Sequence, residues 1–157
     1  MEKFIGTKIV QAEPAWLVFN EPGEPGEVVV QDHDLELTTA KTVLNGYKVI
    51  YEDGYESWSP REVFEKCYRR IDGMNFGLAL EAAKMGRRIA RAGWNGKGQY
   101  VELGVDFEYC TIDGADGHAH HEDIGSRALV FVGTRGRQVG WLASQADMLA
   151  NDWRIVE

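Results

Sequence analysis

The sequence has few cysteines and no long apolar segment. Its 157 residues contain only Cys67 and Cys110, which form no CxxC pair, so we expect two reduced, packed thiols and no disulfide framework. No run of about 18 apolar residues is present, and we therefore expect no membrane partner. Because the N-terminal residues also lack a small-residue cleavage site, we expect a protein that stays in the cytosol.

The chain also lacks an excess of positive charge. Its formal net charge is −8, and such a chain repels a polyanion, so we expect no nucleic-acid polymer as a partner. Residues 1–72 carry 8 Lys and Arg against 14 Asp and Glu, whereas residues 73–157 carry 9 against 11. Two clusters of cations lie in this second part: Lys84, Arg87, Arg88, Arg91 and Lys97, then Arg127, Arg135 and Arg137. Such clusters suit a small anion, although a solvated charged face is their commoner meaning.

Sequence motifs of catalysis are missing as well. There is no GxSxG and no Walker A pattern, and Gly96-Lys97-Gly98 is too short for a phosphate loop. Residues 113–127 contain His118, His120 and His121 among several carboxylates. These are metal-ligating residue types, but a glycine-rich loop does not hold ligands rigidly. We expect a mobile polar loop there, with neither a metal nor a cofactor.

The first half contains clear local signals. Asp53-Gly54, between two aromatic-rich runs, predicts a β-hairpin. The segment after it predicts a helix with Ser59 as N-cap and Pro60 at the first helical position. Residues 3–19 predict a strand with a break at Pro14. We assign these elements to an N-terminal accessory domain over residues 1–72.

The second half begins with a new helix, which Asn75 is expected to cap and Gly86 to end. Short strands are predicted around residues 88–91, 99–104, 107–112 and 127–133, followed by a helix from Ser144 and a last strand around Trp153. The expected fold class is α+β: a small antiparallel sheet packed with short helices over residues 73–157, preceded by a hairpin-plus-helix unit.

The segment RAGWNGKGQY, residues 91–100, combines the parts of a nucleotide site. An aromatic face such as Trp94 stacks on a base, while Arg91 and the backbone N–H groups of a glycine-rich turn bind phosphate. The alternative is a packed core tryptophan in a glycine-framed turn. Similarly, Ser144 and Asp147 have the spacing of a helix capping box, which requires no ligand.

Three features together resemble the Thoeris anti-defence 2 family of phage proteins. They are a helix that ends in glycine and basic residues, an Arg-x-Gly-Trp-Asn-Gly turn, and a C-terminal Gly-Trp-x-x-Ser-x-x-Asp-x-x-x-x-Asp-Trp pattern. The motif positions are Arg91, Gly93, Trp94, Asn95, Gly96, Gly140, Trp141, Ser144, Asp147, Asp152 and Trp153. The resemblance covers most of residues 74–157. Residues 46–72, GYKVIYEDGYESWSPREVFEKCYRRID, resemble a module that phage proteins carry in front of various small domains.

The resemblance implies a sponge in the cytoplasm of the infected bacterium: a homo-oligomer, a dimer of dimers, that sequesters glycocyclic ADP-ribose without cleaving it. It also implies separate sites in some relatives for cyclic di- or trinucleotides of another signalling system. The ligand-binding candidates are Phe76, Gly77, Arg87, Arg88, Arg91, Trp94, Asn95, Gly96, Trp141, Ser144 and Asp147. A second candidate anion site comprises Arg127, Arg135 and Arg137.

Two other hypotheses remain beside the sponge. One is an enzyme that degrades a nucleotide signal, with metal held by residues 118–123. The other is a phage structural or interaction module in which the tryptophans only pack. Under the sponge hypothesis, Trp94→Ala is expected to abolish binding and to leave the fold intact.

Overall fold

The computed structural model describes residues 7–30 and 42–157, which form two compact units divided after Arg69. The sequence predicted a division after residue 72. The intervening residues join the second unit because the Ile155 amide donates a hydrogen bond of 3.0 Å to the Ile71 carbonyl. Within the described residues, no helix is long and apolar enough to cross a membrane.

The first unit is a four-stranded antiparallel sheet in the order β2-β1-β3-β4, followed by a short helix. The elements are β1 Gln11–Phe19, β2 Glu27–Val29, β3 Thr42–Ile50, β4 Glu56–Pro60 and α2 Arg61–Cys67. The β3–β4 hairpin confirms the prediction at Asp53-Gly54, since Gly54 has a φ of +82°. The buried side chains of this unit are Ala15, Val18 and Val49.

Two predictions for this unit are wrong. Strand β1 runs through Pro14 without a break. It does so because β2 pairs only with residues 16–18, which leaves Pro14 at a local edge where a missing N–H is tolerated. Ser59 does not cap the helix: it pairs with Tyr47 inside β4, and Pro60 takes the N-cap position without a side-chain hydrogen bond.

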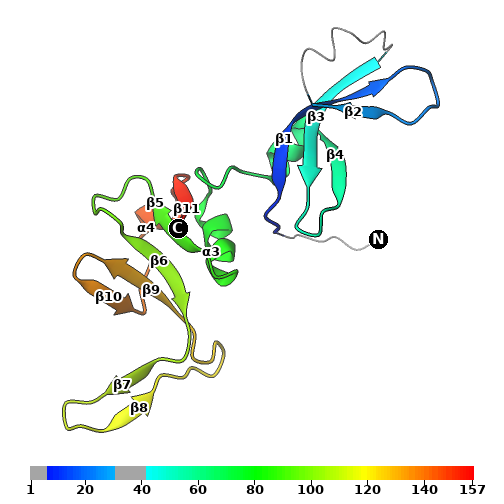
Figure 1. Cartoon of the computed structure of the whole chain (residues 1–157). Helices are drawn as coiled ribbons and strands as arrows, with labels where there is room; N and C mark the ends of the chain where they lie inside the picture. The colour runs from blue at the N-terminus through cyan, green and yellow to red at the C-terminus, as the bar shows by residue number, and fades with distance from the viewer. Residues whose placement is uncertain (1–6, 31–41) are drawn as a thin grey trace. The chain divides into compact units, whose positions relative to one another are not determined.

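The second unit is a five-stranded antiparallel sheet in the order β10-β9-β6-β5-β11, with a separate two-stranded hairpin, β7–β8 (Figure 1). Its elements are α3 Phe76–Lys84, β5 Arg88–Arg91, β6 Tyr100–Gly104, β7 Glu108–Cys110, β8 Asp116–His118, β9 Ala128–Gly133, β10 Gly136–Val139, α4 Gln145–Met148 and β11 Trp153–Val156. The predicted α+β class is confirmed by this combination of antiparallel sheets and short helices.

The core of the second unit lies on one face of the sheet. Ile89, Val101 and Trp153 are fully buried there, together with the alanines that α3 packs against the sheet. The Asn75 side chain accepts a hydrogen bond of 2.9 Å from the Leu78 amide, as predicted for an N-cap. Gly86 follows the helix with a φ of +80°, so the predicted helix end is also confirmed.

Residues 113–127 are not wholly the loop that the sequence predicted. Asp116–His118 form β8, which pairs with β7 and extends from the main sheet as an arm (Figure 1). The hairpin forms because Gly114, with a φ of +88°, makes its turn, where the Thr111 amide also bonds to the Ala115 carbonyl. The expectation of packed thiols is wrong too, since Cys67 and Cys110 are both exposed.

Candidate functional site

Arg91 at the end of β5 is clamped between two carboxylates from distant parts of the chain. Its Nε donates to Asp152 Oδ1 at 2.8 Å, and its Nη1 donates to Asp147 Oδ1 at 3.0 Å. Asp152 also accepts the Gly93 amide at 2.9 Å. We call Arg91, Asp147 and Asp152 the arginine clamp; it joins the end of β5, helix α4 and the start of β11.

Asp147 is the most highly connected residue of the clamp. Its Oδ1 accepts a second hydrogen bond from Trp94 Nε1 at 3.1 Å, while Oδ2 accepts from the amide and the hydroxyl of Ser144. The reciprocal bond from the Asp147 amide to Ser144 Oγ completes the capping box that the sequence predicted. The backbone carbonyl of Asp147 accepts from Trp153 Nε1 at 2.9 Å.

Aromatic rings pack beside the clamp around Trp153. The Phe76 and Trp94 ring centroids each lie 5.4 Å from that of Trp153, and the Trp141 centroid lies 6.0 Å from that of Trp94. Phe131 adds an edge-to-face contact with Trp94 at 5.5 Å. Trp94 is half-buried in this cluster, so the prediction that Trp94→Ala leaves the fold intact conflicts with its packing.

Hydrogen bonding sets the charges of the clamp. Burial by itself raises the pKa of Asp147, but hydrogen bonds from Ser144, Arg91 and Trp94 outweigh it and lower that pKa from 3.8 to about 2. The hydrogen bond from Arg91 also lowers the pKa of Asp152. Both carboxylates are therefore ionised at neutral pH and face a guanidinium whose own pKa they raise.

This pKa shift predicts acid lability of the second unit. A lowered folded-state pKa stabilises the fold above the unfolded-state value, and that stabilisation is lost as the pH falls. For Asp147 we expect about 2 kcal/mol to be lost between pH 4 and pH 2. Urea unfolding across this window measures it. Asp147→Asn should flatten the pH dependence, and an unchanged slope in that variant would contradict the assignment.

The structure brings some sequence-predicted site residues together and separates others. Phe76, Trp141 and Ser144 lie around the Trp153 cluster with Trp94. Asn95 is exposed in the turn after Trp94, and the Gln99 side chain packs over Gly96. Gly77 lies in the first turn of α3, where Phe76 is also located.

Arg87 and Arg88 lie at the opposite end of α3 from this cluster. Arg87 is exposed just after the helix, with its amide bonded to the Ala82 carbonyl. Arg88 and Arg91 are three positions apart on one strand, so their side chains project from opposite faces of the sheet. The motif candidates are therefore divided between two faces.

Arg88 belongs to a second group of charged residues on the sheet face opposite the core. Glu102 joins Arg88 and Arg137, each at 3.5 Å, and the Arg88 guanidinium lies 4.9 Å from the Tyr100 ring centroid. Strand pairing adds Arg154, which is opposite Ala90 on the same face. We call Arg88, Tyr100, Glu102, Arg137 and Arg154 the cationic surface. Alternation along the predicted strands was the signal that could have identified it.

The three arginines of the second candidate anion site do not converge. Arg127 precedes β9 and Arg135 follows it, so the length of the strand, about 20 Å, separates them. Arg127 donates to the Ile124 carbonyl, and Arg135 is exposed in the β9–β10 turn. Of this group only Arg137 joins the cationic surface.

The histidine-rich segment shows no metal geometry. His118 lies 3.9 Å from Glu108, and His121 lies 3.9 Å from Asp123, with all four side chains exposed. In residues 7–30 and 42–157, no three His, Cys, Asp or Glu side chains are arranged to hold a metal ion.

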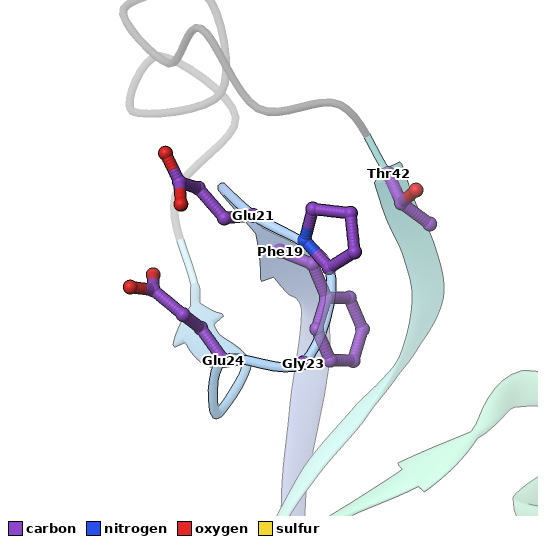
Figure 2. Close-up of a pocket in the computed structure, with 6 residues that line it drawn as sticks. Phe19, Glu21, Gly23, Glu24 and Thr42 are labelled. Atoms are coloured by element: carbon purple, nitrogen blue, oxygen red, sulfur yellow. The ribbon is translucent and has the colours of Figure 1, made fainter.

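An open hollow of about 330 Å³ lies in the first unit, whereas both motifs belong to the second. Phe19, Pro22 and Thr42 line it together with Glu21 and Glu24 (Figure 2). Both carboxylates point away from the Phe19 ring, and among residues 7–30 and 42–157 no basic side chain lines the hollow. A hollow of this charge repels phosphate, so we assign it no part in nucleotide binding.

Comparison with known proteins decides the family. The model of the Thoeris anti-defense 2-like domain matches residues 74–156. Thoeris anti-defense 2 of Bacillus phage SP01 is 34% identical over 90 residues, which cover 53% of this chain and 94% of that protein. The chain belongs to the Thoeris anti-defense 2-like family. The family assignment made from the sequence is thus confirmed, and with it an anti-defence role.

The matched segment contains the whole second unit except its first four residues and Glu157. In this Thoeris anti-defense 2-like domain, the two sequence motifs meet at the arginine clamp: Arg91 and Trp94 come from the first motif, Asp147 and Asp152 from the second. Residues 1–69 lie outside the match. Sequence reasoning had placed Phe131 only in a buried strand, and the structure adds it to the aromatic cluster.

Proposed function

We propose that this protein sequesters a cyclic nucleotide immune signal, glycocyclic ADP-ribose, and releases it unchanged on denaturation. The observation that carries the proposal is the aromatic cluster within the family's domain, in which Phe76, at the first turn of α3, and Trp94 both pack against Trp153. Aromatic faces bind a base by stacking, which contributes about 1 to 3 kcal/mol per base.

The N-terminus of α3 supplies groups for the pyrophosphate. The amides of the first helical turn have no acceptor within the helix. Of the first three amides of α3, only that of Leu78 donates to the Asn75 side chain. The amides of Phe76 and Gly77 remain for an anion, which the helix dipole also favours. Gly77 is exposed, and a Cβ there would approach only the Asn75 side chain, at 3.4 Å.

Gly77→Ala tests this placement because stability and binding should change in opposite directions. Alanine in a helix interior is favoured over glycine by about 1 kcal/mol, so thermal unfolding should shift upward. The added methyl group should weaken binding of glycocyclic ADP-ribose about tenfold, measured by calorimetry. Gly73→Ala is the control, since a Cβ there meets open space. Unchanged affinity in Gly77→Ala would exclude this helix end from the site.

We propose that the protein acts as a homo-oligomer, a dimer of dimers, in the cytoplasm of the infected bacterium. A sponge does not turn over, so a micromolar signal requires a dissociation constant of about 10 nM or lower. A pocket shared between subunits would enclose the ligand better than one small domain. Exposed apolar side chains support association: Leu142 and Leu149 next to α4 are 88% and 76% exposed. Native mass spectrometry measures the subunit number.

The cationic surface is the position we propose for cyclic di- or trinucleotides. Glu102 pairs with the guanidiniums of Arg88 and Arg137, and that of Arg88 lies over the Tyr100 ring, so phosphate-binding and stacking groups occur together. Arg137→Ala should weaken binding of a cyclic dinucleotide about tenfold and leave that of glycocyclic ADP-ribose unchanged. Arg135→Ala, in the neighbouring turn, is the matched control. Equal losses for both ligands would place them in one site.

The direct test of sequestration is recovery of the ligand. Purified protein is mixed with glycocyclic ADP-ribose, filtered to remove free ligand, and heat-denatured, and the released molecules are identified by mass spectrometry. Intact ligand in stoichiometric amount is the expected result. A cleaved product would establish the enzyme hypothesis instead, and no bound ligand would favour the interaction module.

A further inference from the structure

The arginine clamp leaves little hydrogen-bonding capacity for a ligand. An ionised carboxylate has about four acceptor sites, and those of Asp147 are filled by Arg91, Trp94 and two groups of Ser144. Arg91 donates through Nε and Nη2 to Asp152, and through Nη1 to Asp147 and the Ala146 carbonyl. The single N–H of Trp94 is engaged as well.

We infer that Asp147 is a positioning residue, which holds the Trp94 indole in place and does not itself contact the ligand. The expected effect of Asp147 on ligand affinity rests on the proposed function, whereas its effect on the orientation of Trp94 does not. This positioning role differs from the direct role expected for Asp147 from the sequence motif, because every acceptor of the carboxylate already faces a group of the same domain.

The geometry explains how Asp147 acts on Trp94. The indole is half-buried, with its edge packed against Phe131, Trp141 and Trp153. Apolar packing alone permits the ring to turn within such a cluster. The bond from Nε1 to Oδ1 selects one orientation, and Arg91 and Ser144 fix the carboxylate from its other sides. The ligand then contacts the Trp94 ring and neighbouring residues such as Asn95.

A double-mutant cycle distinguishes positioning from direct contact. Asp147→Ala removes the acceptor of the Trp94 N–H, and Trp94→Phe keeps an aromatic ring but removes the N–H donor. If Asp147 acts through Trp94, each change should lower the affinity for glycocyclic ADP-ribose about tenfold, and the double variant should lose no more than either single variant. If the two losses of affinity multiply, so that the double variant binds about a hundredfold more weakly, the proposal is overturned.

The second readout needs no ligand. Near-ultraviolet circular dichroism of free Asp147→Ala should show a changed indole signal, because the Trp94 N–H has lost its acceptor. Asp152→Asn is the matched variant: it also removes a carboxylate from Arg91 but leaves the bond from Trp94 to Asp147, so its indole signal should stay close to wild type. An unchanged signal in Asp147→Ala would overturn the proposal whatever the ligand.

Two further measures keep the test decisive. Should Asp147→Ala fail to fold, Ser144→Ala replaces it in both experiments, since it removes a group that orients the same carboxylate. Should the wild-type protein not bind glycocyclic ADP-ribose at all, the proposed function fails, and the circular dichroism still decides whether Asp147 positions Trp94.

Discussion

Trp153→Ala should lower the unfolding free energy of the second unit by about 4 kcal/mol, because it empties the centre of the core. Trp153 is fully buried, and its ring touches those of Phe76, Trp94 and Trp141. Its backbone pairs with Met74, and its Nε1 bonds to the Asp147 carbonyl. Calorimetry should show a midpoint about 20 °C lower for the transition of the second unit.

The control for this substitution is Ile112→Ala, at the exposed turn of the β7–β8 hairpin. A surface change of this kind should alter stability by less than about 0.5 kcal/mol. A Trp153→Ala protein with a midpoint close to that of Ile112→Ala would contradict the assignment of Trp153 to the core.

Arg91→Ala should destabilise the second unit by about 3 kcal/mol, since it leaves two ionised carboxylates facing each other without a counter-charge. The Arg91 and Asp147 side chains are only 19% and 14% exposed, so water screens the remaining repulsion poorly. Adding Asp152→Asn to Arg91→Ala should restore about 1 kcal/mol. Urea unfolding at neutral pH measures both effects.

Arg70→Ala provides the matched control. Arg70 also forms two hydrogen bonds with a carboxylate, that of Asp72, but the two side chains are 86% and 56% exposed. Exposed pairs contribute about 0 to 1 kcal/mol. If Arg91→Ala and Arg70→Ala cost the same, burial of the clamp does not decide its strength.

The arginine clamp gives the two family motifs a structural meaning that does not depend on the ligand. Residues of the Arg-x-Gly-Trp-Asn-Gly turn bond to residues that lie more than fifty positions away in the second motif. A motif of this kind would be required for folding even in a relative that binds another signal. Specificity would then reside in groups outside the clamp, such as Asn95 or the cationic surface.

Local physics determined what the sequence predicted correctly. Asn75 and Ser144 cap helices through residues three positions ahead, and Gly54 and Gly86 adopt the positive φ that a turn or a helix end requires. These features involve neighbours in the chain, so residue type and spacing are sufficient. The α+β class followed from the same local signals, while the failure at Ser59 arose because strand pairing competed with the cap.

The sequence by itself determined the family, the fold class and the residues of both motifs. Only the tertiary structure decided their partners. Spacing in the sequence predicted only the capping box between Ser144 and Asp147, whereas the pairing of β5 with β11 brings Arg91 and Trp94 within hydrogen-bonding distance of the Asp147 carboxylate. It also placed Arg88 and Arg91 on opposite faces of the sheet and separated Arg127 from Arg137 by the length of a strand. The physical reason is that these relations depend on strand register and sheet order, which pair residues distant in the chain and which no local propensity specifies.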